Sequence, residues 1–389
     1  MKKIFAAILS IAMMIPVSAN AGIIQASSKS CKVGSTKSDS TYKYVCVTPG
    51  VWKKTLIPVK VIPIKPAASP QMETATPVTT IIVATAPKIF NIDNLTPSLV
   101  FSKSRESIAQ AIASSAYSVS GITFNVGPNV DKSKVNVEKQ TLEQTAKLWG
   151  NLYKPNNNVQ IVFYNYQDLD WAKTKVTQLS ASASLYSANS CTSTYCGNAS
   201  AGLLTNGIWL FEEGLGGGLR NRSTSAHEYT HLAQGAFDPQ YWTDAPLWLV
   251  EGMAQFYGEA IGYGSFDSNN QTRLESHRGL AQDYQFGTSQ TIKSLLEKND
   301  IANTNAIMQS IEFPSPRYTA GSLPLSYVVG GYATEVLVAV YGQQSMEKFV
   351  SSFASSKDWQ KNFKDSFGLT KDEFYAKITT YLAEVSKEL

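Results

Sequence analysis

Apolar residues recur at helical and strand spacings from about residue 97 to the C-terminus at residue 389. Residues 135–153 and 169–179 show the three- and four-residue spacing of amphipathic helices. Between them, the apolar run 159–164 follows three asparagines and predicts a buried strand. Towards the end, residues 346–382 place aromatic side chains at helical spacing. The pattern predicts an α+β protein, in which a lobe of helices and strands precedes a mostly helical lobe.

The start of the chain has the pattern of a secretory signal peptide. Residues 1–21 combine two early lysines, an apolar run and the cleavage sequence Ala19-Asn20-Ala21. The apolar run is shorter than the roughly 20 residues that span a bilayer, and no other stretch looks long enough. We therefore expect no transmembrane anchor in the mature chain, and no lipid anchor because residue 22 is Gly. The mature protein is expected to be secreted, to the periplasm, the cell surface or the medium, after cleavage near Ala21.

Two further segments separate this signal from the main domain. Residues 22–54 are rich in Lys, Ser and Thr and are too few to build much core. Residues 55–96 carry six prolines among Val, Ile, Thr and Ala, which predicts a semi-extended linker. We expect residues 22–54 either to contact a cell surface or wall polymer or to be a simple appendage, and residues 97–389 to form the functional domain.

The four cysteines form two local pairs, Cys31 with Cys46 and Cys191 with Cys196. An even number of cysteines in an exported chain favours disulfide bonds. Three connectivities are possible, and the local one, Cys31–Cys46 with Cys191–Cys196, is preferred. A second metal site is the rival interpretation, but no histidine lies near either pair.

The charge of the chain argues against nucleic acid as a partner. It has 34 lysines and arginines against 30 acidic residues, a net charge of +4 that becomes +2 when Lys2 and Lys3 are removed with the signal. The basic residues are also scattered rather than run together, so we expect no nucleic-acid binding.

The most specific motif is His227-Glu228-Tyr229-Thr230-His231, which holds two of only three histidines in the chain. On a helix, positions i and i+4 share one face about one turn apart, so both imidazoles can bind a single zinc ion. The glutamate after the first histidine can hold a water molecule without binding the metal. The motif predicts a hydrolytic zinc site rather than a solvated helix end.

Such a site needs a third protein ligand and leaves one position for water. Nineteen residues separate His231 from Glu251, which lies in the apolar segment 245–254. Pro246 suits the first turn of a second helix. A carboxylate among apolar residues is costly to bury unless it is paired or bound to a metal. We therefore expect Glu251 to be the third ligand rather than to point outward.

The H-E-x-x-H motif and the later sequence W-L-x-E-G-x-A resemble the gluzincin metallopeptidases, specifically their peptidase-MA-like branch. The resemblance covers residues 140–389 and implies Zn²⁺ as cofactor. It implies His227, His231 and Glu251 as zinc ligands and Glu228 as general base. It also implies a two-lobed zincin-like fold, with a mixed-sheet N-terminal lobe that carries the active-site helix and a mostly helical C-terminal lobe.

The resemblance further implies a tyrosine that hydrogen-bonds the oxyanion. Tyr327 is the candidate, Tyr332 competes with it, and a core aromatic without a catalytic role stays open. One position departs from several gluzincins, which have an aspartate four residues after the third ligand. Here Gln255 takes that place, and Glu259 follows four residues later. Either side chain could support a zinc-bound histidine through its second ring nitrogen.

Three other segments have expected roles around the motif. The apolar run 207–211 is predicted to be an exposed strand edge that pairs with an extended substrate. The glycine-rich stretch 214–219 lacks phosphate-binding spacings and predicts a flexible loop at the mouth of a cleft, or a mobile connector. His277 lies in a predicted surface helix, where it is expected to be solvated rather than catalytic.

These observations predict a secreted zinc metallopeptidase, a hydrolase that acts on peptide or protein substrates. An endopeptidase is favoured over an aminopeptidase, because no acidic motif for a free amine is evident. Two alternatives are a catalytically silent zincin-like module that binds a surface, and a zinc amidase that acts on cell-wall cross-links. A silent module would need neither Glu228 nor Glu251. Residues 22–96 could also be a pro-segment.

Overall fold

The computed structural model describes residues 36–38, 42–48, 51–56 and 90–389, without residues 151, 154–157, 217–221, 239, 263–270, 284–289 and 320. The chain divides into two compact units, Pro16–Ala86 and Met1–Ile15 with Pro87–Leu389, and each is described separately. The predicted signal peptide, the predicted Cys31–Cys46 bridge and most of the predicted linker lie outside the described residues.

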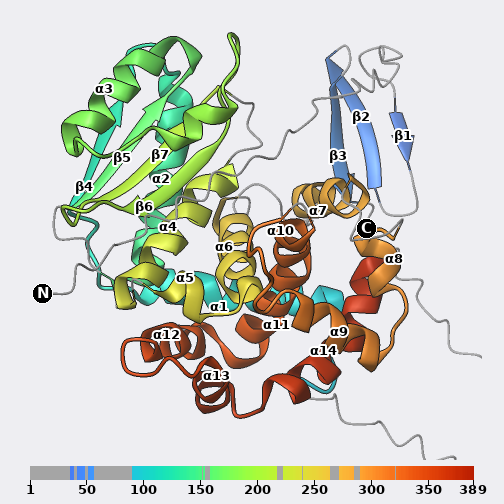
Figure 1. Ribbon diagram of the computed structural model, residues 1–389. Coiled ribbons are helices and arrows are strands. Elements are labelled where there is room, and N and C mark those ends of the chain that lie inside the picture. The colour runs from blue at the N-terminus through green and yellow to red at the C-terminus, as the bar shows by residue number, and fades with distance from the viewer. Residues whose placement is uncertain are drawn as a thin grey trace, which may run out of the picture. The chain divides into compact units, whose positions relative to one another are not determined.

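The smaller unit contains a three-stranded antiparallel sheet with the order β1-β2-β3 (Figure 1). Its strands are β1 (Thr36–Ser38), β2 (Tyr42–Thr48) and β3 (Val51–Leu56). In the register of this sheet, Tyr44 of β2 lies opposite Lys37 of β1 and Lys54 of β3. The sheet falls within the module predicted for residues 22–54, except that β3 continues past its end.

The larger unit contains a four-stranded mixed sheet with the order β4-β5-β7-β6. Its strands are β4 (Ile122–Val126), β5 (Val159–Tyr164), β6 (Ala199–Leu203) and β7 (Trp209–Gly214). β4, β5 and β7 are parallel, and β6 pairs antiparallel with β7. The prediction of an exposed edge at residues 207–211 is wrong, because β7 is paired on both sides. Among the described strands, the edges of this sheet are β4 and β6.

Helices cover both faces of this sheet because its side chains are apolar on both. On one face, Val162, Tyr164 and Leu210 pack against α3 (Leu169–Leu179). On the other face, Ile161 and Phe211 belong to the main core with α2 (Lys132–Trp149) and the helix after β7. The helix predicted at 169–179 and the strand predicted at 159–164 are confirmed. The helix predicted at 135–153 starts three residues earlier, where the side chain of Asp131 caps it.

The rest of the larger unit is helical. Its described helices are α1 (Pro97–Ser114), α4 (Arg222–Phe237), α5 (Tyr241–Asp244), α6 (Leu247–Gly262), α7 (Gln271–Asp283), α8 (Ile292–Leu296), α9 (Ile301–Ser310), α10 (Ser322–Leu325), the π-helical turn η4 (Ser326–Gly330), α11 (Gly331–Tyr341), α12 (Gln343–Ser352), α13 (Trp359–Phe367) and α14 (Lys371–Ser386). The coarse α+β class predicted from the pattern is therefore confirmed, with a small mixed sheet and mostly helical content. α1 departs from the predicted order of the lobes, because it packs on α11 although it precedes the sheet.

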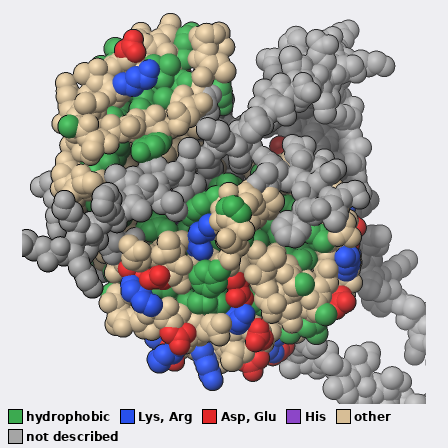
Figure 2. All heavy atoms as spheres, in the orientation of Figure 1, with side chains coloured by type: hydrophobic (Ala, Val, Ile, Leu, Met, Phe, Trp, Pro, Cys, Tyr) green, Lys and Arg blue, Asp and Glu red, His purple; other side chains and the backbone are tan. Residues whose placement is uncertain are grey.

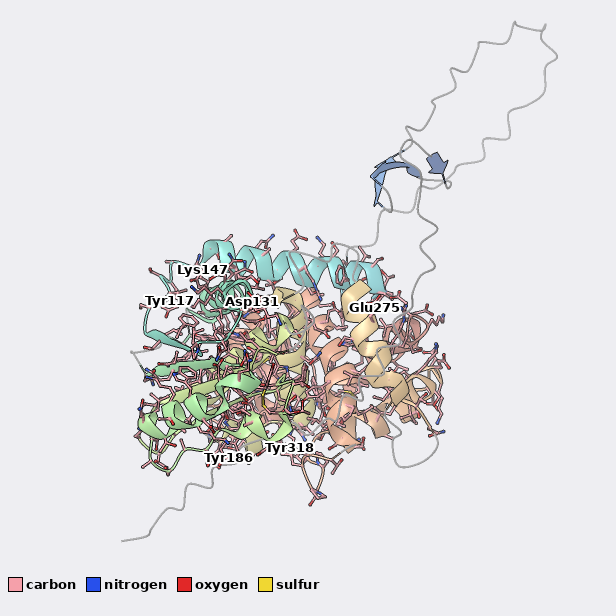
Figure 3. All side chains as sticks on the ribbon, turned by 90° about the horizontal axis from the view of Figure 1, so that it is seen from above. Tyr117, Asp131, Lys147, Tyr186, Glu275 and Tyr318 are labelled. Carbon is pink, nitrogen blue, oxygen red and sulfur yellow. A yellow bond between two sulfur atoms is a disulfide. The ribbon has the colours of Figure 1, made fainter. Side chains whose placement is uncertain are left out.

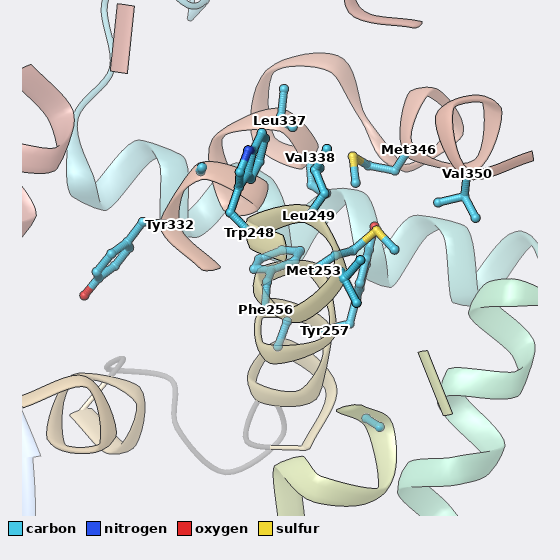
Figure 4. Close-up of a cluster of buried hydrophobic side chains, with 14 of the residues drawn as sticks. Trp248, Leu249, Met253, Phe256, Tyr257, Tyr332, Leu337, Val338, Met346 and Val350 are labelled. Atoms are coloured by element: carbon cyan, nitrogen blue, oxygen red, sulfur yellow. The ribbon is translucent and has the colours of Figure 1, made fainter. Parts of the chain in front are cut away.

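The helix α6 is the centre of the core. Every residue of α6 except Gln255 is buried. Figure 4 shows Trp248, Leu249 and Met253 of this helix beside Val338 of α11 and Met346 of α12. The segments α10, η4 and α11 form a run, Ser322–Tyr341, that is long and apolar enough to span a membrane, but 89% of its 18-residue apolar stretch is buried inside the protein. By length and composition, the expectation that no stretch after the signal peptide is long enough to span a membrane is therefore wrong, and the apolar character of this run suits its buried place in the core.

The surface view in Figure 2 adds the distribution of charge on one face of the molecule. Acidic and basic side chains are interspersed over the helical C-terminal part, whereas the sheet side of this face carries few charges. No large patch of a single sign is seen among the coloured side chains of this view.

Candidate metal centre

Two histidines of α4 direct their ring nitrogens to the same point. His227 and His231 lie one turn apart, with their Nε2 atoms 3.1 Å apart and their ring centroids 4.8 Å apart. Only 5% of His227 and 4% of His231 is exposed. Two nitrogen lone pairs repel each other at this distance, so the pair needs a proton or a metal ion between them.

Glu251 of α6 completes a group of three ligand atoms. Its Oε2 lies 3.6 Å from Nε2 of His227 and 3.5 Å from Nε2 of His231. Glu251 is 0% exposed, and neither carboxylate oxygen has a hydrogen-bond partner among the described residues. Ligand atoms at tetrahedral positions, roughly 2.0–2.2 Å from a zinc ion, are about 3.3 Å apart. The separations of the three donor atoms therefore fit one metal ion of this size.

Backbone contacts fix the start of α6 and let it approach α4 closely. The first N–H groups of α6 have partners from a distant segment, since Leu247 N donates to Glu312 O at 2.7 Å and Trp248 N to Ile311 O at 3.1 Å. Further along, a Cβ atom at Gly258 would lie 2.7 Å from the carbonyl oxygen of Ser223 and 3.1 Å from Cβ of His227. Glycine at this position lets the two helices approach closely beside the first histidine.

The ionisation of the cluster follows from its burial and its charges. Burial raises the pKa of Glu251, but attraction to His231 and His227 outweighs burial and lowers the pKa to about 2. Burial lowers the pKa of His231, but the carboxylates of Glu251 and Glu228 outweigh this effect and raise the pKa to about 9. Burial also raises the pKa of Glu228, despite the opposing effect of both histidines. In the absence of metal, His231 therefore holds a proton that a metal ion would have to displace.

The second ring nitrogen of His231 has a partner on its own helix. His231 Nδ1 lies 2.9 Å from Oε1 of Gln234, and Gln234 Nε2 donates to the carbonyl oxygen of Val250 at 3.0 Å. Gln234 is 0% exposed. Because its amide oxygen is an acceptor, His231 carries hydrogen on Nδ1 and directs Nε2 towards Glu251. Gln234 thus orients one histidine and ties α4 to the residue that precedes Glu251.

This arrangement corrects the expectation that Gln255 or Glu259 supports a histidine of the motif. Gln255 does not contact a histidine of the motif; its Nε2 donates to Oε1 of Glu259 at 2.7 Å. The same Glu259 oxygen lies 3.0 Å from Nε2 of His277. His277 is 1% exposed, so the prediction of a solvated histidine on a surface helix is wrong. Its imidazole is buried because Glu259 of α6 and Tyr332 of α11 face it.

Of the two candidate tyrosines, Tyr327 lies beside the cluster. Its ring centroid is 5.8 Å from that of His227, and 3% of the residue is exposed. It belongs to the π-helical turn η4, which contacts α6 through two glycines: a Cβ atom at Gly252 would lie 2.2 Å from the carbonyl carbon of Gly330. Tyr332 instead faces His277, with ring centroids 4.8 Å apart.

Three residues near the cluster were missed in the sequence. Gln234 lies three positions after His231, a spacing that places both on one helical face and could have identified it. Trp242 of α5 has its ring centroid 5.3 Å from that of His231. Tyr318 lies in the loop before α10, and the Glu251 carboxylate is close enough to add to the effect of burial in raising the pKa of its phenol. Nothing in the local sequence of Trp242 or Tyr318 points to the site.

A disulfide bond fixes the chain at the start of the glycine-rich stretch. Cys191 and Cys196 are bonded, as the local pairing predicted. Gly216 N donates to Cys196 O at 2.6 Å, and a Cβ atom at Gly214 would lie 2.8 Å from Cβ of Cys196. The predicted loop 214–219 therefore starts from a fixed point, while residues 217–221 lie outside the described part of the chain.

Comparison of the chain with protein-family models, with curated proteins and with solved structures found no significant match.

Proposed function

We propose that the chain is a zinc-dependent peptidase of the gluzincin type, with a zincin-like arrangement of a mixed-sheet lobe and a helical lobe. The observation that carries this proposal is the convergence of three buried donor atoms, from His227, His231 and Glu251, beside a fourth buried side chain, Glu228. A buried carboxylate whose oxygens have no hydrogen bond is costly, and a cation at this point would offset that cost.

A zinc ion held by these three residues would polarise a substrate carbonyl and lower the pKa of a water molecule. The residues of the chain would supply the remaining steps. Glu228 is the next residue to a ligand and is 5% exposed, so it would accept the proton of the attacking water and pass it to the leaving amine. The phenol of Tyr327 would donate a hydrogen bond to the oxyanion as it develops.

An extended peptide also needs a backbone partner, and the sheet offers one close to α4. β6 is an edge strand that contacts α4, and its outer edge has no strand partner among the described residues. A substrate strand that pairs with β6 would be held by main-chain hydrogen bonds. This edge takes the role that the sequence assigned to residues 207–211.

The first test is the zinc content of the purified mature protein after dialysis against metal-free buffer. We expect about one zinc ion per chain, and loss of it in Glu251→Ala. The matched control is Glu106→Gln, which removes an exposed carboxylate of α1 that pairs with Lys103 and should keep the metal. A protein that neither contains zinc nor takes it up would contradict the proposal and favour a silent binding module.

The second test is hydrolysis of unfolded casein and of a quenched peptide library. Glu228→Gln should keep its zinc and lose about 10²–10⁴-fold in rate, the usual contribution of a general base. Full activity of this variant would remove Glu228 from the proposed chemistry. Hydrolysis of cell-wall amides without hydrolysis of peptides would instead favour the amidase.

A further inference from the structure

One position of α6 is open to the outside, although the rest of this helix is buried. Gln255 is the only residue of α6 that keeps partial exposure. It follows Glu251 by one turn, so the two positions share a face of the helix and lie about 6 Å apart along its axis. A partly exposed polar side chain therefore stands next to the candidate metal centre.

The open position lies between two close contacts of α6. Gly258 approaches α4, and Gly252 approaches η4. At 3.6 residues per turn, position 255 falls between these two sides of the helix. A Cβ atom at Gly331, the first residue of α11, would lie 3.9 Å from Cγ of Gln255. Gln255 is therefore located at the seam between α4 and the segment that carries Tyr327.

The amide of Gln255 has a fixed direction. Its Nε2 donates to Oε1 of Glu259 at 2.7 Å. An ionised carboxylate can only accept hydrogen bonds, so the NH₂ group faces Glu259 and the carbonyl oxygen Oε1 of Gln255 is directed away from it. This carbonyl oxygen has no partner among the described residues. Gln255 thus presents an unused acceptor at the partly exposed position of α6.

A buried pair behind Gln255 keeps its amide in this direction. Glu259 is 2% exposed, and Nε2 of His277 lies 3.0 Å from the oxygen that accepts from Gln255. His277 belongs to the inner face of α7, whereas Glu275 of the same helix, labelled in Figure 3, is exposed. Burial of a carboxylate and an imidazole is costly, and the proposed reaction uses neither of them. Orientation of the Gln255 amide is a role that accounts for their place.

We propose that Oε1 of Gln255 accepts a hydrogen bond from a substrate N–H group close to the bond that is cut. This inference rests on the proposed peptidase function, and it adds a substrate contact on the helical lobe to the one proposed on β6. A peptide offers two kinds of N–H donor, the amides of its main chain and the free amine at its N-terminus. A main-chain amide would suit an endopeptidase, and a terminal amine would suit an aminopeptidase.

The experiment measures binding, so that it does not depend on turnover. A peptide that the unmodified protein hydrolyses is taken from the quenched library and titrated into zinc-loaded Glu228→Gln protein. One series has blocked ends and carries a methyl group on one amide nitrogen at successive positions. A second series compares the free N-terminal amine with the des-amino peptide, which lacks that donor. Each titration is repeated with Gln255→Met or Gln110→Met added. Gln110→Met is the matched control, because Nε2 of Gln110 also donates to a glutamate of its own helix, Glu106, at 3.4 Å.

We expect removal of the N–H group that contacts Gln255 to weaken binding about 3–10-fold for an amide, as for a hydrogen bond between neutral groups, and more for a charged amine. This loss should disappear in Gln255→Met and remain in Gln110→Met, and the series in which it occurs tells an amide from a terminal amine. Losses at positions that pair with β6 should remain in every variant. If every loss persists in Gln255→Met, or if no removal weakens binding, the inference is overturned. If Gln255→Met does not fold, Gln255→Leu and Gln255→Ala decide in the same way. Failure of the peptidase proposal would be recognised separately, from zinc content and from turnover by the unmodified protein.

Discussion

Gln234 offers the sharpest test of how the metal centre is built, because one side chain serves both a ligand and the neighbouring helix. Gln234→Met keeps the length and apolar volume of the side chain but removes the acceptor for His231 Nδ1 and the donor to Val250 O. The Nδ1–H of His231 then loses its acceptor in a site that is 0% exposed at residue 234, whereas the carbonyl oxygen of Val250 lies inside α6 and keeps its helical hydrogen bond. One unsatisfied buried group costs about 1–3 kcal/mol, so we expect a loss of about 1–3 kcal/mol in the free energy of unfolding.

The same substitution should weaken metal binding, since His231 would no longer be held in the tautomer and orientation that present Nε2. Loss of such a partner typically costs about 10–100-fold in metal affinity. Zinc affinity is measured by competition with a fluorescent chelator, and stability by guanidinium unfolding of the metal-free protein. Gln234→Glu keeps an acceptor for His231 and should retain more of the affinity.

Thr230→Val is the matched control for this prediction. Thr230 lies on the same helix and is 0% exposed. Its Oγ1 donates to the carbonyl oxygen of Ala226 at 2.8 Å, and this hydrogen bond involves neither imidazole. Its substitution should lower stability but leave zinc affinity unchanged. If Gln234→Met bound zinc as tightly as the unmodified protein, the reasoning about the second ring nitrogen would be refuted.

Three further predictions concern the sheet, the helix contact and the reaction. Burial raises the pKa of Glu212 to about 7 although Ser200 and backbone N–H groups donate to it. A raised pKa contributes stability at low pH that is lost as pH rises through about 7. The free energy of unfolding of Glu212→Gln, relative to that of the unmodified protein, should therefore increase by about 2–3 kcal/mol between pH 5 and pH 8. A difference between the two proteins that does not change with pH in unfolding experiments would contradict this. Gly252→Ala should lower the free energy of unfolding by more than about 1–3 kcal/mol, because the added Cβ would meet the backbone of Gly330. Gly279→Ala is the control: a Cβ there has nothing within 4 Å, so this variant should be neutral or stabilising in thermal unfolding. Tyr327→Phe keeps the ring but not the hydroxyl and should lower kcat about 10²-fold or more with unchanged zinc content, and an unchanged kcat would exclude the phenol from the reaction.

The parts of the site that lie on one helix could be predicted from the sequence, because helical spacing alone relates them. The positions i and i+4 of His227 and His231 are of this kind, and Gln234 could have been found by the same rule. Glu251 required one more argument, that a carboxylate within an apolar segment needs a compensating partner. Its position next to both histidines in the structure agrees with that argument.

The errors occurred where the partner is distant in the sequence. His277 was expected at the surface because its helix is rich in polar residues. In the structure, Arg273 and His277 share one buried face of α7, and their partners Glu335 and Glu259 come from two other helices. Likewise, the assignment of residues 207–211 to a sheet edge failed because strand order is not a local property: the short segment β6 adds to the outer side of β7.

Close backbone contacts at two glycines explain how helices from separate parts of the chain meet at the site. A Cβ at Gly252 would collide with Gly330, and one at Gly258 would collide with the backbone of α4 at Ser223. These two glycines let α6 touch η4 on one side and α4 on the other. Since close-packed backbones leave little freedom to slide, the fold itself brings Glu251, the two histidines and Tyr327 together. A metal ion would then bind to donor atoms that already converge, and the energy of binding would not be spent on bringing the helices together.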